Sequence, residues 1–247
     1  MKIYEPKLVV LENEVVLDQY MVDLVVEQIC LQKDSVLTLP TGNTPLGMYK
    51  GLVDVYRNGK VSFDKVRICN LDEYWPIERN SPDSYYSYMR NNFVDLVDLP
   101  SENWFIPNGE CVDPDVEAKR FDNLVSKLQV DLAVVGLGPG LTCHVGFNEP
   151  GGEFDSRTRL VELHATTKEV NSKLFRDETT SVSSAITQGL GTIMEAKRIV
   201  LMAKGKGKAE GVRRFLKGKV GVGAPASVLR TREQVEVVLD REAAGLL

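Results

Sequence analysis

This chain of 247 residues has little histidine or cysteine, with two residues of the first and four of the second. The cysteines are scattered and form no Cys-x-x-Cys pair, so we expect reduced thiols and no metal site. No apolar run approaches the about 20 residues that cross a bilayer. The acidic start MKIYEPKLVVLENE lacks the apolar stretch of a signal peptide. These absences predict a cytoplasmic protein with no membrane partner.

A basic excess is also absent, because 30 Lys and Arg residues face 35 Asp and Glu residues, for a formal net charge of −5. Binding to a phosphate backbone needs a basic face, so we expect no nucleic-acid partner. Hydrophobic residues make up 43% of the chain and charged residues 26%, which excludes an intrinsically disordered protein. The length fits a single domain over 1–247.

Short apolar runs alternate with amphipathic stretches along the chain. The runs predict strands at 35–39, 66–71, 130–135 and 198–203, with a last edge strand at 235–239. Helices are predicted at 82–93, 114–128 and 206–217, and another opens at Thr44-Pro45. This alternation predicts an α/β fold, a Rossmann-like single domain with a mostly parallel sheet flanked by helices on both faces. Ligands bind at the carboxyl ends of the strands in such folds.

The loop after the first predicted strand suits an anion. Thr41, Gly42, Asn43 and Thr44 lie just before a helix N-terminus, where backbone N–H groups, hydroxyls and the helix dipole favour negative charge. The alternative is an ordinary turn with Thr44 as the helix N-cap. The loop lacks the Gly-Lys-Ser/Thr ending of a Walker motif.

Two adjacent acids, Asp72 and Glu73, follow the second predicted strand. Neighbouring residues of an extended chain point to opposite faces, so only one of them should face a cleft. Burial there would raise the pKa of that carboxyl group and suit it for general-base catalysis. The alternative is a carboxylate that caps a helix or stabilises a turn.

The third loop, residues 136–152, is rich in glycine and contains His144 and Glu149. A carboxylate that accepts from one ring nitrogen orients the other toward a substrate. The second histidine, His164, has no such neighbours and is interpreted as structural.

Lysines form the last candidate group. Lys173 lies in the segment NSKLF, and a glycine-lysine loop with Lys204, Lys206 and Lys208 follows the strand at 198–203. Such lysines suit a phosphate, with Lys208 the strongest candidate. The alternative is solvated surface charge.

These motifs together resemble one known family, the glucosamine-6-phosphate deaminases/isomerases with their galactosamine-6-phosphate branch. The 6-phosphogluconolactonases are more distant relatives. The motifs that carry the resemblance are LPTGNTP (39–45), NLDEYW (70–75), SYYSYM (84–89), GLG (136–138), HVGFNEPG (144–151), SRTR (156–159), NSKLF and the glycine-lysine loop. The resemblance implies conversion of an aminosugar 6-phosphate to the ketose 6-phosphate and ammonia, with no cofactor and no metal.

The resemblance also implies roles for particular residues. Asp72 would move the C2 proton to C1, and His144, held by Glu149, would assist opening of the pyranose ring. The 6-phosphate of this small-molecule substrate would be surrounded by Thr41, Gly42, Asn43, Thr44, Lys173 and Lys208.

The chain departs from the family pattern GLG-x-Asp/Asn-Gly-His before His144, where it has two extra residues and Thr142-Cys143. Threonine donates or accepts a hydrogen bond but does not stabilise an imidazolium by charge. Two other functions therefore stay open: a 6-phosphogluconolactonase-type hydrolase that activates water with His144, and a non-catalytic sugar-phosphate-binding protein. The choice between glucosamine and galactosamine is open as well.

Two further expectations concern larger segments. Residues 154–176 are polar, follow the third loop and are predicted to act as a lid. The helix at 206–217 offers a surface for a homo-oligomer.

Overall fold

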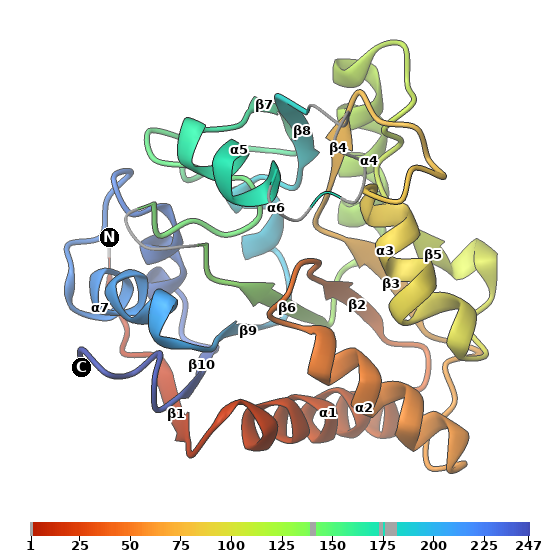
Figure 1. Ribbon diagram of the computed structural model, residues 1–247, viewed down its shortest axis with the longest axis horizontal. Coiled ribbons are helices and arrows are strands. Elements are labelled where there is room, and N and C mark those ends of the chain that lie inside the picture. Colours follow the sequence, from red (N-terminus) through yellow and green to blue (C-terminus); the bar gives the residue numbers. More distant parts are fainter. Residues whose placement is uncertain (1, 139–141, 173–174, 176–181) are drawn as a thin grey trace.

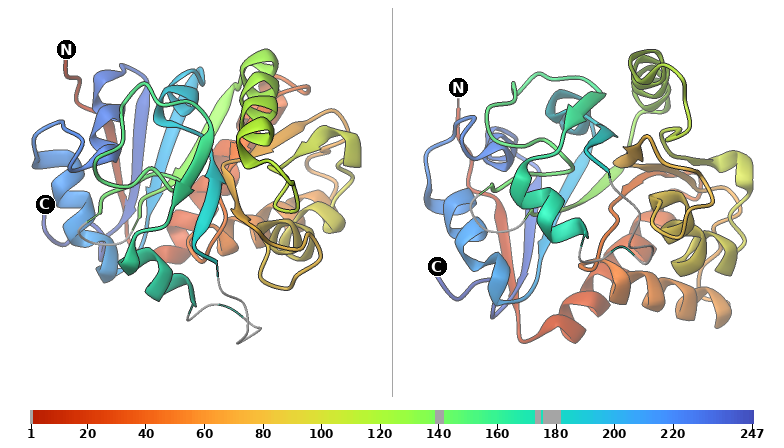
Figure 2. Two further views of the ribbon diagram at one scale, coloured as in Figure 1. Left: turned by 90° about the horizontal axis from the view of Figure 1, so that it is seen from above. Right: turned by 45° about the horizontal axis from the view of Figure 1, so that its top comes forward.

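The computed structural model describes residues 2–138, 142–172, 175 and 182–247. Its main sheet has seven strands, all parallel, which run side by side through the middle of the molecule (Figures 1 and 2). In spatial order they are β1 (Lys7–Leu11), β10 (Val235–Asp240), β9 (Arg198–Ala203), β6 (Leu132–Gly136), β2 (Val36–Leu39), β3 (Arg67–Asn70) and β5 (Trp104–Phe105). The predicted α/β fold with a mostly parallel sheet is confirmed.

One strand prediction was wrong about position. The strand expected at 235–239 is not at the edge, because β10 lies between β9 and β1. The edge on this side is β1, which the sequence pattern did not predict, and it pairs in parallel with β10 from Glu236 to Asp240.

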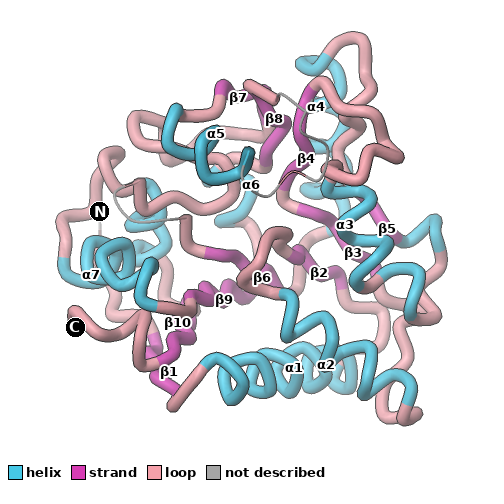
Figure 3. Tube along the Cα trace, in the orientation of Figure 1, coloured by secondary structure: helices cyan, strands magenta, loops and turns pink. Residues whose placement is uncertain are grey.

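Helices cover both faces of the main sheet, as alternating strand residues require. Leu37, Val134 and Val200 pack into one apolar cluster, whereas Val135 and Leu201 pack into the cluster on the opposite face. Figure 3 shows the strands as a row between the two layers of helices. The first face is covered by α1 (Glu14–Leu31), α2 (Leu46–Arg57) and α3 (Tyr85–Asn92), and the second by α4 (Pro114–Leu128), α6 (Leu190–Met194) and α7 (Ala209–Lys217).

Local sequence signals set several helix ends. Asp113 caps α4 by accepting from the backbone N–H groups of Asp115 and Val116, and the helix has its predicted bounds. Helix α2 begins after Pro45 without a side-chain cap, so the interpretation of Thr44 as an N-cap is wrong. The helix predicted at 206–217 starts as a 3-10 turn, Lys206–Lys208, that continues into α7.

A second, antiparallel sheet was missed by the sequence analysis. It contains β4 (Asp72–Trp75), β8 (Ser184–Thr187) and β7 (Arg159–Glu162), and α5 (Ala165–Ser172) follows β7. The strand predicted at 66–71 thus ends at Asn70, and only Leu71 separates it from β4. The segment predicted as a lid contains β7 and α5.

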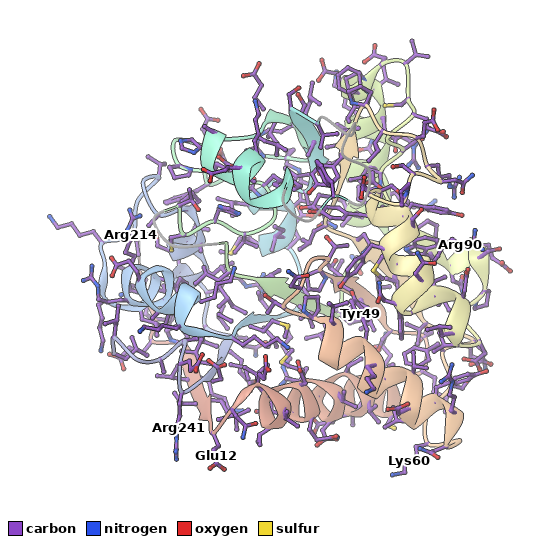
Figure 4. All side chains as sticks on the ribbon, viewed as in Figure 1. Glu12, Tyr49, Lys60, Arg90, Arg214 and Arg241 are labelled. Atoms are coloured by element: carbon purple, nitrogen blue, oxygen red, sulfur yellow. The ribbon has the colours of Figure 1, made fainter. Side chains whose placement is uncertain are left out.

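The distribution of side chains follows the layers. Figure 4 shows Lys60, Arg90 and Arg241 at the periphery and Tyr49 inside, where α2 meets the sheet. The apolar face of α7 is also internal, because Val212 and Phe215 are buried in the cluster of the second face. No helix in the part of the chain that the structure describes is long and apolar enough to cross a membrane.

Candidate active site

A cavity of about 500 Å³ opens at the carboxyl ends of β2, β3, β6 and β9. Strand order reverses there, since the chain continues from β2 to β3 on one side and returns to β6 on the other. Helix α5 and the small sheet lie over this end of the main sheet (Figure 1). The sequence-predicted residues that line the cavity are Thr41, Gly42, Asn43, Thr44, Asp72, His144 and Lys208. Lys173 lies outside the described residues.

Two tyrosines hold the loop after β2 in place. The hydroxyl of Tyr49 donates to the carbonyl oxygen of Pro40 at 2.6 Å, and that of Tyr88 donates to the carbonyl oxygen of Gly42, also at 2.6 Å. Both tyrosines come from helices that pack on the main sheet, so core packing fixes the position of the loop. The loop carbonyls are thereby turned toward the protein at the site predicted for an anion.

Asp72 and Glu73 point to opposite sides of β4, as the extended backbone predicts. Asp72 lines the cavity, and burial raises its pKa to about 7, against the opposing effect of a hydrogen bond from the Thr187 hydroxyl at 3.5 Å. Glu73 instead accepts from the backbone N–H groups of Tyr85 and Tyr86, both at 2.8 Å, at the start of α3. The capping interpretation is therefore right for Glu73, and only Asp72 is placed to act on a ligand.

His144 is buried against the glycine-rich loop. Its Nδ1 lies 2.8 Å from the Thr142 hydroxyl oxygen. Burial, followed by the charges of Lys208 and His164, lowers its pKa to about 4, so the ring is neutral at pH 7. A Cβ on Gly138 would lie 2.3 Å from Nε2 of His144, so only glycine lets the loop pass over the imidazole ring.

The expected contact between Glu149 and His144 is replaced by two others. The hydroxyl of Thr142, two residues before the histidine, is the hydrogen-bond partner of Nδ1 of His144. The Oε2 atom of Glu149 accepts from the backbone N–H of His164 at 3.0 Å, just before α5, and its Oε1 atom is buried without a hydrogen-bond partner among the described residues. Glu149 therefore connects the glycine-rich loop to α5, and His164 supplies that contact through its backbone.

The three lysines after β9 have different surroundings. Lys208 donates to the carbonyl oxygen of Leu137 at 2.5 Å, and burial lowers its pKa to about 8. Lys204 lines the cavity and is paired with Asp18. Lys206 is exposed, as the interpretation of solvated surface charge predicts.

Sequence reasoning missed several residues of the cavity wall, among them Tyr85, Thr167 and Glu14. Tyr85 belongs to the motif SYYSYM, whose sequence alone indicates no role for it, and its hydroxyl lies 3.1 Å from that of Tyr74. Thr167, in α5, and Glu14, in α1, belong to none of the sequence motifs described above. In the described part of the chain, no three His, Cys, Asp or Glu side chains gather as metal ligands would.

Comparisons with known proteins agree on one family. The model of the family described as glucosamine-6-phosphate isomerases/6-phosphogluconolactonase matches residues 15–238. A glucosamine-6-phosphate deaminase from Clostridium botulinum (strain Loch Maree / Type A3) is 38% identical over 242 residues, which cover 98% of each chain. Its counterpart from Clostridium acetobutylicum is 37% identical over 98% of this chain and 100% of its own.

Solved structures give the same result. A monomeric glucosamine-6-phosphate deaminase superposes with a TM-score of 0.94 at 37% identity, covering 98% of this chain and 100% of its own. The 6-phosphogluconolactonase from Trypanosoma brucei has a TM-score of 0.76 at 22% identity over 99% of each chain. At that identity the second likeness concerns the fold alone.

Proposed function

The chain belongs to the family of glucosamine-6-phosphate isomerases and 6-phosphogluconolactonases, and we propose that its substrate is glucosamine 6-phosphate, with Asp72 as the base. It is an aminosugar-6-phosphate deaminase, as are relatives that cover 98% of its length. Glucosamine is the sugar that those relatives' names carry. The observation that supports the assignment of the base is a buried carboxyl group in the cavity with a pKa near neutrality.

The proposed reaction needs one proton shuttle. After the ring opens, the Asp72 carboxylate removes the C2 proton and returns it to C1. The amino group gives up one proton and O1 takes one up, so the 2-amino aldose becomes a 2-imino sugar with a C1 hydroxyl. Water then adds to the imine carbon, and ammonia leaves with formation of fructose 6-phosphate. One water is consumed and one ammonia is released. A carboxyl group with a pKa of about 7 exchanges a proton readily in both directions at neutral pH.

Ring opening is assigned to His144. Its neutral imidazole can take the proton of the anomeric hydroxyl and deliver a proton to the ring oxygen. The Thr142 hydroxyl both donates and accepts, so it accommodates either tautomer of the ring. The departure at position 142 is thus compatible with catalysis. In this proposal Glu149 acts by connecting the glycine-rich loop to α5.

The 6-phosphate is assigned to the loop Thr41–Thr44 and to Lys208. The loop lies at the N-terminus of α2, where the helix dipole favours an anion, and the half-buried Lys208 lines the same cavity. Lys173 is proposed as a further phosphate ligand on the resemblance alone.

Assembly and location follow from the same assignment. A solved relative is described as monomeric, and α7 buries its apolar face within this chain, so we expect a monomer of 27.5 kDa in light scattering. A cytoplasmic location fits a sugar-phosphate substrate.

The first experiment measures ammonia release from glucosamine 6-phosphate and galactosamine 6-phosphate, side by side. Release from the first sugar is expected, and Asp72→Asn should lower kcat by about 10²–10⁴-fold. Calorimetry should show that this variant still binds fructose 6-phosphate. A fully active Asp72→Asn enzyme would remove Asp72 from the mechanism. Hydrolysis of 6-phosphogluconolactone without any ammonia release would favour the lactonase alternative, and binding without turnover would favour a sugar-phosphate-binding protein.

A further inference from the structure

An ion pair that the mechanism above does not use lies in the wall of the cavity. Lys204 follows β9, and its Nζ lies 2.9 Å from Oδ1 and 2.8 Å from Oδ2 of Asp18, in α1. Their side chains are only 12% and 16% exposed, so this is not a pair of solvated surface charges. Lys204 lines the same cavity as the loop Thr41–Thr44 and Lys208.

The position of Asp18 places the pair at the end of the cavity assigned to the phosphate. A Cβ on Gly47, in the first turn of α2, would lie 1.9 Å from Oδ2 of Asp18. Glycine is therefore required for the close approach of α1 to α2. The backbone of Met48 contributes a hydrogen bond that lowers the pKa of Asp18, against the larger effect of burial, which raises it. Asp18 and Lys204 thus meet where the loop Thr41–Thr44 enters α2.

The phosphate of the proposed substrate carries more negative charge than one lysine neutralises. A phosphate monoester carries close to two negative charges at neutral pH. Among the described residues assigned to the phosphate, Lys208 is the only cation, and it already donates to a carbonyl oxygen. An ammonium group has three donors, of which Asp18 accepts two from Lys204. Glu14 also lines the cavity and adds negative charge on this side.

We propose that Lys204 is a second phosphate-binding cation, held in position by Asp18, whose carboxylate limits how tightly the phosphate binds. The inference rests on the proposed function, because it takes the phosphate end of the substrate to be at the loop Thr41–Thr44. Phosphate and Asp18 share one ammonium group, so they compete for its charge. Removing the lysine should weaken phosphate binding, whereas removing the negative charge of Asp18 should strengthen it.

Two variants break this ion pair from opposite sides. Lys204→Met should raise KM for the aminosugar 6-phosphate by about 10- to 100-fold, the range of a lost charge-assisted hydrogen bond, with the loss falling on KM more than on kcat. Asp18→Asn keeps the shape of the side chain and should lower KM several-fold. Lys206→Met is the matched control, because it removes one lysine two residues away that is exposed. Its KM should stay within about twofold of the wild type.

Binding of inorganic phosphate, measured by calorimetry, gives a readout that does not need turnover. Its affinity should fall in Lys204→Met and rise in Asp18→Asn. Shifts of both variants in the same direction would mean that the pair only supports the fold, and would overturn the inference. Lys204→Arg keeps the charge and should restore most of the affinity, even if Asp18→Asn does not fold. A wild-type protein that releases no ammonia would count against the proposed function, while the phosphate measurement would still decide the role of Lys204.

Discussion

Replacing Gly138 by alanine should disable His144 while leaving the rest of the cavity in place. A Cβ on Gly138 would lie 2.3 Å from Nε2, 2.4 Å from Cδ2 and 2.4 Å from Cε1 of the imidazole. Carbon atoms pack at about 3.5 Å or more, so the ring must move by about 1 Å. A misplacement of about 1 Å in a catalytic group costs on the order of 10²-fold in rate. We therefore expect kcat/KM for ammonia release to fall about 100-fold.

The same loop supplies the control. Gly136 also lines the cavity, but a Cβ there has no atom within 4 Å. Gly136→Ala should therefore retain activity within a few-fold of the wild type. Coupled ammonia release over a range of substrate concentrations separates kcat from KM, and circular dichroism melts show that both variants fold. Equal activity of the two variants would refute the position of the imidazole against Gly138 or its part in catalysis.

Two other predictions test the base and the fold. Because Asp72 must be deprotonated to act and its pKa is about 7, kcat/KM should fall about tenfold per pH unit below that value. Thr187→Val removes the hydrogen bond that lowers the pKa of Asp72. A bond as long as this one is worth about 0.5 kcal/mol, so its loss should raise that pKa, and move the acidic limb of the pH profile, by about 0.4 unit. Thr38→Val, which removes a buried hydroxyl without a partner among the described residues, should leave the limb unmoved. A limb that did not differ between the two valine variants would contradict the role of Thr187. Asp131→Ala leaves the buried backbone N–H of Val36 unpaired and should lower the free energy of unfolding by about 2 kcal/mol in urea titrations, and an unchanged value would argue against that contact.

The parts of the fold that local signals determine could be predicted from the sequence. Helix α4 has both of its predicted bounds because Asp113 caps it and Pro114 suits the first turn. Strand β9 also has its predicted bounds, since its apolar run is buried on both faces of the sheet. The small sheet could not be predicted, because one residue, Leu71, separates β3 from β4 and the local pattern continues through it. Tertiary pairing with β8 is what separates β4 from the main sheet.

In the candidate site, too, some features could be predicted from local sequence and others depend on tertiary contacts. The residues that follow β2, β3, β6 and β9 meet in one cavity because the ends of parallel strands lie together, and sequence order alone identifies those ends. Contacts between distant elements were not accessible. Asp18 and Lys204 are 186 residues apart, and the contact of Glu149 with His164 depends on where α5 packs. Neither contact has a signature in the spacing of the residues.

The direct connection between the two sheets has a consequence for the size of the substrate. The loop Thr41–Thr44, to which we assign the 6-phosphate, follows β2 in the main sheet, whereas Asp72 is the first residue of β4 in the small sheet. Only the buried Leu71 separates β3 from β4, so the packing of the two sheets fixes the distance between the loop Thr41–Thr44 and Asp72. That fixed distance selects substrates by the number of carbons between the phosphate and the reacting carbon. If the proposed roles hold, a six-carbon sugar anchored at that loop by its 6-phosphate would present C2 to the Asp72 carboxylate. A five-carbon aldose phosphate, anchored in the same way, would place its aldehyde carbon C1 at that point, and an aldehyde C–H is not acidic enough for the base to remove.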